Sequence, residues 1–262
     1  MPAGTNQPAI RCSKILVGMK NRTEKYDFTV IVPVFNEIGN MRRLEETFSS
    51  WLGESPCSAC ILFVDDGSTD GSREAIDDIC RRNEDMFFIS FGKNRGLSSA
   101  IKAGMDHVCS PLLGYIDADL QTSPSDFNLL LQFAGEYQLV NGIRVNRKDS
   151  AFKHLQSKIA NGFRRMMTGD DATDTGCPLK VMHTSTAKRI PMFKGMHRFF
   201  PALVMLQEGA RYKEVPVRHF PRVAGKSKFS IWNRLAGPFA DCFAYRWMRK
   251  RAINYSVSDK NI

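Results

Sequence analysis

From Asp27 onward, the hydrophobic and polar positions of the chain follow two alternating periodicities. The run Phe28 to Val32 is apolar or β-branched throughout and stops at Pro33, which predicts a short buried strand. The apolar residues that come next recur at spacings of three and four, which predicts an amphipathic helix. The inner face of this helix would carry Met41, Leu44, Thr47, Phe48 and Trp51.

The same alternation of strand and helix continues to residue 116. We expect further strands at Cys60 to Val64, Met86 to Phe91 and Leu112 to Ile116, and further helices at Ser72 to Arg82 and Ser98 to Val108. Apolar strands that alternate with helices are typical of parallel sheets that are covered on both faces. The sequence therefore predicts an α/β fold with a Rossmann-like, mostly parallel sheet and helices on both faces.

Polar clusters follow the ends of all four predicted strands. Turn chemistry alone can place Asp at such positions, and we expect Asp65 and Asp70 to brace their loop in this way. In open α/β sheets, however, ligands bind outside the carboxyl ends of the strands, so four clusters at one edge indicate a binding site. The clusters are Asn36 and Glu37; Asp65, Asp66 and Asp70; Lys93, Asn94 and Arg95; and Asp117, Asp119 and Gln121.

The strongest chemical signal is the triplet Asp117-Ala118-Asp119, which directly follows an apolar strand. Two carboxylates with one small residue between them offer the hard oxygen ligands that Mg²⁺ and Mn²⁺ prefer. Beside a phosphate-bearing donor, such a metal ion would neutralise the diphosphate as it leaves. The triplet therefore predicts a site for Mg²⁺ or Mn²⁺.

Four motifs of the first half resemble the successive signatures of family 2 glycosyltransferases, which have the GT-A fold: Thr29 to Glu37, Val64 to Ser72, Asn94 to Gly104 and Ile116 to Pro124. The resemblance implies a nucleotide-sugar pocket and a catalytic group that holds the metal and the diphosphate. Phe35 stands where the family often has Tyr, so an aromatic ring is kept and a hydroxyl is lost. The implied pocket residues are Pro33, Phe35, Asn36, Glu37, Asp66, Asp117, Ala118 and Asp119, and the implied catalytic and metal-binding residues are Asp117, Asp119 and Gln121.

The charge of the chain is unevenly distributed. Up to Asn141 there are 13 Lys and Arg against 19 Asp and Glu, a net charge of −6, whereas from Gly142 onward there are 24 against 8, a net charge of +16. The second half is thus the half expected to meet an anion. A nucleic acid, an anionic membrane surface and a phosphorylated lipid all fit this charge, as does a solvated basic surface.

Segments of the second half resemble a narrower group, the dolichyl-phosphate and polyprenyl-phosphate sugar synthases. The matching segments include Gly142 to Arg147, Phe152 to Gly169, Asp174 to Val181, Gly195 to Leu203 and Arg222 to Ser230. The segment Phe152 to Gly169 also has the pattern of an amphipathic helix with one polar face. By this resemblance, the lipid phosphate would be received by Arg144, Lys153, Ser157, Arg222, Ser227 and Lys228.

These observations favour an inverting transfer of a sugar from a UDP- or GDP-sugar to a polyprenyl phosphate. The second pKa of a phosphate monoester is about 6, so the attacking oxygen needs no base. We identify no carboxylate between Asp126 and Lys228 as a base, and His197 need not act as one. A saccharide acceptor in cell-surface glycan synthesis is the alternative, and it would need a base. A nucleic-acid-binding protein leaves the acidic strand ends unexplained and lacks a reader motif, and the intact Asp117 and Asp119 argue against a silent sensor.

We expect three regions: a loosely ordered leader (1–26), a catalytic domain (27–230) with a nucleotide-sugar half (27–141) and an acceptor half (142–230), and a basic, aromatic amphipathic tail (231–262). The tail would lie on anionic lipid or bind a separate membrane subunit, with a break at Gly237-Pro238. Seven scattered cysteines, the pair Cys57 and Cys60 included, indicate reduced thiols. No secretory signal or membrane span is evident, so we expect a cytoplasmic protein, peripheral at the inner face of the membrane.

Overall fold

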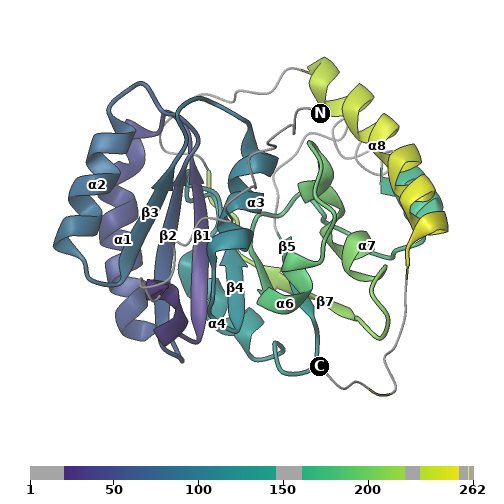
Figure 1. The fold of residues 1–262 in the computed structure, drawn as a ribbon, viewed down its shortest axis with the longest axis horizontal. Coiled ribbons are helices and arrows are strands. Elements are labelled where there is room, and N and C mark those ends of the chain that lie inside the picture. Colours follow the sequence, from purple (N-terminus) through teal and green to yellow (C-terminus); the bar gives the residue numbers. More distant parts are fainter. Residues whose placement is uncertain (1–20, 146–160, 222–230, 254–258, 260–262) are drawn as a thin grey trace, which may run out of the picture.

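The computed structural model describes residues 21–145, 161–221, 231–253 and 259. Its strands form one seven-stranded sheet with the order β3-β2-β1-β4-β6-β5-β7 (Figure 1). The strands are β1 (Phe28–Val34), β2 (Ala59–Asp65), β3 (Met86–Ser90), β4 (Leu112–Tyr115), β5 (Leu139–Arg144), β6 (Lys180–His183) and β7 (Tyr212–Val217).

The sheet is mostly parallel, as the sequence predicts. Strands β3, β2, β1 and β4 run parallel, so their carboxyl ends lie at one edge. Strand β6 is antiparallel to both of its neighbours, β4 and β5, and β7 is again parallel to β5. In the register of β6, Lys180 lies opposite Tyr115 of β4 and Asn141 of β5. Strand β6 therefore joins the two halves of the sheet.

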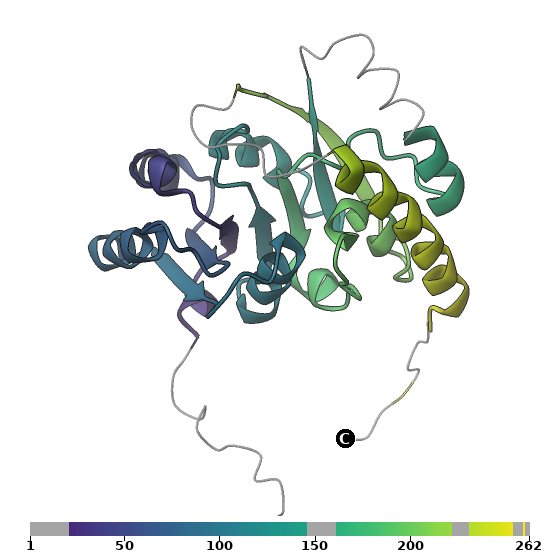
Figure 2. The ribbon, with the colours of Figure 1, turned by 90° about the horizontal axis from the view of Figure 1, so that it is seen from above.

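Helices cover both faces of the sheet. One apolar core lies under α1 (Met41–Glu54), α2 (Ser72–Arg82) and α4 (Phe127–Leu131). The other lies under α3 (Leu97–His107), α6 (Thr184–Lys188), α7 (Phe200–Val204) and α8 (Ile231–Arg251). Figure 2 shows α8 along one outer side of the molecule, beside the helical residues 161–168. The 3-10 helices are η1 (Arg22–Lys25), η2 (Ile38–Asn40), η3 (Pro124–Asp126) and η4 (Met196–Phe199).

Two predicted breaks at proline are wrong. Strand β1 continues through Pro33 to Val34. The ladder between β1 and β4 ends at the pair Ile31 and Tyr115, so Pro33 lies beyond it and its missing N–H removes no bond from that ladder. The tail is not broken at Gly237-Pro238 either, because α8 runs through both residues.

Tertiary packing explains why α8 continues past its proline. A proline inside a helix removes one hydrogen bond and costs about 3 kcal/mol. The following turns of α8 are anchored to the rest of the protein, since Cys242 and Tyr245 are each only 2% exposed. The Tyr245 hydroxyl also donates to the carbonyl oxygen of Ala202 in α7 at 3.1 Å. This buried face fixes the direction of the helix.

The end of the expected leader is ordered. Residues 21–26 include η1, which Asn21 caps by accepting a hydrogen bond from the Thr23 N–H at 3.0 Å. Tyr26 is buried, and its hydroxyl donates to the Asp85 carboxylate at 2.5 Å. Cys57 and Cys60 are both free thiols, in agreement with the sequence prediction. The first half of the predicted helix Phe152 to Gly169, residues 152–160, lies outside the described residues.

The close packing of Gly114 in β4 yields a test of the core. A Cβ atom at this position would lie 2.5 Å from the Phe28 ring and 2.9 Å from the Phe127 ring. We expect Gly114→Ala to lower the free energy of unfolding by roughly 1 to 3 kcal/mol, because two packed rings must move. Urea denaturation measures this change. The matched control is Gly53→Ala in α1, where nothing lies within 4 Å; it should be neutral or stabilising by up to about 1 kcal/mol. Equal effects of the two substitutions would contradict the packing described.

Candidate active site

The loops after β1 and β2 are joined by side-chain-to-backbone hydrogen bonds. Asn36, with a φ of 51°, accepts a hydrogen bond at Oδ1 from the Thr69 N–H at 2.8 Å, and its own N–H donates to Ser68 Oγ at 3.0 Å. The Glu37 N–H donates to Ser72 Oγ at 2.9 Å. The two polar clusters predicted after these strands therefore lie side by side at the carboxyl edge of the sheet.

Asp65 and Asp70 brace this loop pair, as the sequence predicts. Asp65 is fully buried and accepts hydrogen bonds from the Ser68 N–H at 3.0 Å and the Ser90 hydroxyl at 2.6 Å. Asp70 accepts from both the N–H and the hydroxyl of Ser72, at 3.0 and 2.6 Å. Both carboxylates are thus engaged in holding the backbone.

Asp66 connects the β2 loop to the loop that precedes α3. Its carboxylate accepts hydrogen bonds from Asn94 Nδ2 at 2.9 Å and from the N–H groups of Arg95 and Gly96 at 2.6 and 2.8 Å. Burial raises its pKa above the usual value, and these backbone hydrogen bonds act against the rise. The family resemblance implies that Asp66 lines the nucleoside pocket. In the structure its carboxylate holds the backbone of the loop that would border that pocket.

The carboxylates of Asp117 and Asp119 lie at the end of β4. The Tyr115 hydroxyl donates to Asp117 Oδ1 at 2.6 Å, and Asp119 Oδ1 accepts from the Gln121 N–H at 3.1 Å. Leu120, which stands between Asp119 and Gln121, has a φ of 51°, so the chain turns sharply directly after Asp119. Burial, and after it the charge of Asp119, raises the pKa of Asp117 to about 6. Two like charges are thus held together in a poorly solvated place.

Gln121 connects this acidic turn to the segment after β7. Its carbonyl oxygen accepts a hydrogen bond from the Phe220 N–H at 2.8 Å, and its Nε2 donates to the Phe220 carbonyl oxygen at 3.4 Å. Nearby, the Arg218 guanidinium pairs with Asp126 at 2.7 Å. The segment that leads from β7 toward residues 222–230 therefore begins beside the acidic turn.

The donor set at this turn suits a hard divalent cation. Asp117 and Asp119 supply carboxylate oxygens, and a cation would relieve the repulsion that raises the Asp117 pKa. Within the described residues, no group of three or more His, Cys, Asp and Glu side chains could hold a metal by itself. Mg²⁺ commonly binds through one or two carboxylates together with substrate phosphates, so two carboxylates are compatible with this binding mode.

Of the six residues predicted to receive the acceptor phosphate, the structure describes one. Arg144, at the end of β5, pairs with Asp174 through two hydrogen bonds of 2.8 Å, from Nε and Nη2, and each side chain is 16% exposed. The other five lie outside the described residues: Lys153, Ser157, Arg222, Ser227 and Lys228.

Lys180 of β6 is a site residue that the sequence analysis missed. It is 2% exposed, and its ammonium donates to the carbonyl oxygens of Cys177 and Thr175. Burial lowers its pKa, while the charges of Asp174 and Asp117 nearby act to raise it. A lysine inside an apolar strand was the available signal, because buried lysines are rare unless they are paired.

His197 is held as a neutral imidazole. It lies in η4, directly before α7, and its Nδ1 is 2.8 Å from Ser98 Oγ at the start of α3. Burial, and after it the charges of Arg198 and Lys180, lowers its pKa to about 3. An imidazole of that pKa is a poor proton acceptor, which agrees with the expectation that His197 need not act as a base.

The raised pKa of Asp117 leads to a stability prediction for the metal-free protein. A carboxyl group whose pKa is higher in the folded state than in the unfolded state loses stabilisation as the pH rises through both values, here from about 4 to about 6. We expect Asp117→Asn to raise the free energy of unfolding by about 2 to 3 kcal/mol at pH 7.5 and by less than about 1 kcal/mol at pH 4. Urea denaturation in EDTA measures both values. A gain that does not depend on pH would contradict this account.

A model of glycosyl transferase family 2 matches residues 29–193. The chain is 31% identical over 205 residues to the undecaprenyl-phosphate 4-deoxy-4-formamido-L-arabinose transferase of Edwardsiella ictaluri, a match that covers 78% of this chain and 63% of the relative. It is also 31% identical over 219 residues to the dodecaprenyl-phosphate galacturonate synthase of Rhizobium johnstonii, covering 82% and 65%. The matches thus span less than two thirds of the length of either relative.

Two solved glycosyltransferase structures share the fold. One is a mannosyltransferase from Pyrobaculum calidifontis in complex with GDP-Man and Mn²⁺, with a TM-score of 0.60, 15% identity and coverage of 90% of this chain and 67% of that one. The other is the glucosyl-3-phosphoglycerate synthase of Mycobacterium tuberculosis with Mn²⁺, UDP-glucose and phosphoglyceric acid, with a TM-score of 0.60, 14% identity and coverage of 88% and 82%. The predicted GT-A fold is confirmed, and the chain belongs to glycosyl transferase family 2.

Proposed function

We propose that this chain transfers a sugar from a UDP- or GDP-sugar to the phosphate of a polyprenyl phosphate, with inversion, at the cytoplasmic face of a membrane. The observation that carries the proposal is the carboxylate pair of Asp117 and Asp119 at the carboxyl edge of the parallel strands. The names of both relatives combine a polyprenyl phosphate with a sugar transferase or synthase. These names support a polyprenyl phosphate as the acceptor.

The donor would lie over the joined loops after β1, β2 and β3. Pro33 is buried at the end of β1, and Phe35 and Glu37 are half-buried in the loop that follows. Asp66 holds the backbone of Arg95 and Gly96, and so fixes the third loop relative to the second. A rigid border of this kind reduces the ordering needed when a nucleotide binds.

The acidic turn would hold the diphosphate through a metal ion. Asp117 and Asp119 are the ligands that we assign to Mg²⁺ or Mn²⁺, with Gln121 beside them. The Tyr115 hydroxyl fixes the orientation of Asp117, and the Gln121 N–H fixes that of Asp119. When bound, the metal supplies positive charge to the departing nucleoside diphosphate.

The engagement of several second-half carboxylates among the described residues favours a phosphate acceptor over a saccharide. Three carboxylates of the second half are engaged elsewhere: Asp170 with Arg164, Asp174 with Arg144, and Glu214 with Thr173. A sugar hydroxyl needs a general base to become a nucleophile, whereas a phosphate monoester is largely deprotonated at neutral pH. The saccharide acceptor remains the alternative that the experiment must exclude.

The decisive experiment is a product assay. The full chain is incubated with Mg²⁺ or Mn²⁺, a panel of UDP- and GDP-sugars, and either undecaprenyl phosphate or an oligosaccharide, and new products are identified by mass spectrometry. We expect a glycolipid with one donor, and a loss of at least about a hundredfold for Asp119→Asn, because a metal ligand is removed. The variant should remain folded, since Asp119 lies in a turn. Products on the oligosaccharide alone would exclude the lipid acceptor, and full activity of Asp119→Asn would exclude the metal assignment.

Helix α8 supplies a surface suited to lipid. Phe239, Phe243 and Trp247 recur every four residues and are 52%, 52% and 61% exposed, while Cys242 and Tyr245 on the inner side are buried. Phe239 also stacks on Phe163 of the neighbouring helical segment at 4.7 Å. Of the two partners that the sequence left open, a membrane surface and a membrane subunit, this pattern favours the surface.

Basic residues border the aromatic stripe. Arg246, Lys250 and Arg251 are exposed on α8, and the Arg251 guanidinium lies 5.1 Å from the centre of the Trp247 ring. Aromatic rings together with cations are typical of helices that lie on anionic bilayers. None of the described helices is both long and apolar enough to cross a membrane.

The lipid surface can be tested with vesicles. We expect Phe243→Ala combined with Trp247→Ala to weaken sedimentation with vesicles of phosphatidylcholine and phosphatidylglycerol by at least about tenfold, because two inserting rings are lost. The matched control is Leu129→Ala on α4, which is 43% exposed and belongs to the opposite face of the sheet. Wild-type binding by the double variant, or equal binding of the wild type to pure phosphatidylcholine, would contradict a basic and aromatic lipid surface.

A further inference from the structure

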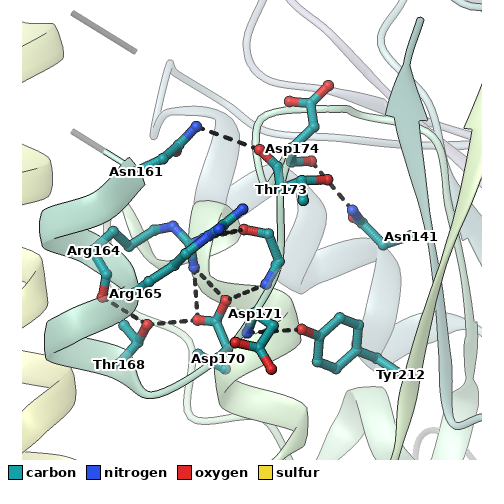
Figure 3. Close-up of polar contacts among 12 residues, drawn as sticks. Asn141, Asn161, Arg164, Arg165, Thr168, Asp170, Asp171, Thr173, Asp174 and Tyr212 are labelled. Atoms are coloured by element: carbon teal, nitrogen blue, oxygen red, sulfur yellow. Dashed lines mark hydrogen bonds and ion pairs between the residues drawn. The ribbon is translucent and has the colours of Figure 1, made fainter. Parts of the chain in front are cut away.

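Residues 169–174 form a strap that connects the helical residues 161–168 to strands β5 and β7 (Figure 3). The strap contains several polar side chains, and its residues before Asp174 play no part in the chemistry proposed above. The strap is nevertheless more densely hydrogen-bonded than a connecting loop requires. Its anchors lead, one after another, to the guanidinium of Arg144.

The first anchor is a buried ion pair. Arg164 Nη1 lies 2.5 Å from Asp170 Oδ1, and the two side chains are 9% and 1% exposed. Asp170 also accepts hydrogen bonds from the Thr168 hydroxyl at 2.6 Å and the Ala172 N–H at 2.9 Å, while Arg164 Nη2 donates to the Ala172 carbonyl oxygen. Buried ion pairs add little net stability, because the cost of desolvation offsets the attraction. The effect of this pair that matters here is that it fixes residues 170–172 relative to the helical residues 161–168.

The second anchor comes from β7 and β5. Glu214 of β7 accepts hydrogen bonds from the Thr173 N–H at 2.9 Å and the Thr173 hydroxyl at 2.6 Å. Asn141 of β5 donates through Nδ2 to Glu214 Oε1 at 3.3 Å and to the Asp174 carbonyl oxygen at 3.2 Å. Lys180 holds the next residues by donating to the Thr175 and Cys177 carbonyl oxygens. The backbone on both sides of Asp174 is thereby fixed to the sheet.

Asp174, the last residue of the strap, binds the guanidinium of Arg144. Asp174 accepts hydrogen bonds from Arg144 Nε and Nη2, both at 2.8 Å, and from the Arg144 N–H at 3.1 Å. A guanidinium has five N–H donors, and Asp174 takes two of them. Gly176 leaves room for the group, because a Cβ there would lie 3.2 Å from Arg144 Nη2. The orientation of the guanidinium is therefore set by the strap.

Arg144 is oriented close to the acidic turn. Strands β4 and β5 both run antiparallel to β6, so Asp117, two residues after Tyr115, and Arg144, three residues after Asn141, follow the sheet at the same edge. The register supports this placement, since Lys180 pairs with Tyr115 on one side and Asn141 on the other. A cation with spare donors so near the reacting groups is suited to an oxyanion.

We propose that Asp174 is a positioning residue that holds Arg144 so that its remaining N–H donors meet the phosphate of a prenyl phosphate acceptor. The proposal rests on the proposed function. Asp174 itself touches no substrate and acts through Arg144, and the anchors at Asp170 and Glu214 keep it in place. Two donors in a fixed plane match two phosphate oxygens, which a freely rotating arginine would do less often.

The test measures binding and transfer separately. Farnesyl phosphate binding to the full chain is followed by calorimetry, and transfer to undecaprenyl phosphate and hydrolysis of the donor by water are followed by product analysis. We expect Asp174→Asn to weaken farnesyl phosphate binding roughly tenfold and to raise the KM for undecaprenyl phosphate to a similar degree, because a charge-assisted contact is misaligned. Donor hydrolysis should stay within about twofold of the wild-type rate.

A double-mutant cycle separates positioning from a general structural role. In an Arg144→Ala background, Asp174→Asn should add no further loss of farnesyl phosphate binding, because Asp174 acts only through Arg144. The control is Asp171→Asn, on an exposed residue of the same strap, which should bind as the wild type does. If Asp174→Asn fails to fold, Arg144→Lys must show the same loss of binding, since an ammonium lacks the planar pair of donors.

The outcomes distinguish this inference from the proposed function. Wild-type binding and transfer by Asp174→Asn, or additive losses in the double variant, would overturn the positioning role and leave the glycosyltransferase assignment intact. A wild-type protein that makes no glycolipid but binds farnesyl phosphate in an Arg144- and Asp174-dependent manner would keep the positioning role and overturn the proposed acceptor. A wild-type protein that neither binds farnesyl phosphate nor makes a glycolipid would overturn both, and one that makes a glycolipid whose KM for undecaprenyl phosphate does not change in Asp174→Asn would overturn the positioning role alone.

Discussion

The partial burial of two like charges at the end of β4 is the constraint on which the rest of the site depends. Asp117 and Asp119 stand one residue apart at the end of an apolar strand, so water can screen them only partly. The neighbouring groups counter this cost: the Tyr115 hydroxyl binds one carboxylate, and Lys180 and Arg144 supply positive charge from the next two strands. A nucleotide-bound cation would offset the remaining repulsion between the two carboxylates, so this repulsion is greatest when no cation is bound.

Much of the first half could be predicted because each element carries its own local pattern. Helix α2 has the predicted bounds, Ser72 to Arg82; β3 and β4 differ from the prediction by one residue at one end, and β2 by one residue at each end. The two errors at proline arose because a local rule ignores which neighbour a strand has and what a helix packs against. The acidic turn could also be predicted from the local sequence, because its two Asp residues, with one residue between them, directly follow an apolar run.

The second half of the site was less predictable because its contacts are not local. Asp174 and Lys180 acquire their roles only when β6 inserts antiparallel between β4 and β5, and no periodicity encodes that pairing. The sequence resemblance drew attention to the segment Asp174 to Val181 without giving its partners. It also gave Arg144 a role as a phosphate ligand, whereas the structure adds the carboxylate that orients it.

The antiparallel strand β6 has a consequence for how such a protein can be recombined. Because Lys180 pairs in register with both Tyr115 and Asn141, strands β3, β2, β1 and β4 on one side of β6 and strands β5 and β7 on the other are parts of one continuous sheet and cannot close on each other like hinged lobes. Exchange of the segments after β4 between relatives would thus succeed only at crossover points that preserve this three-strand register. Strand β6 holds the two parts in one sheet, so a change of function in a recombined chain would have to arise in the segments and helices around it.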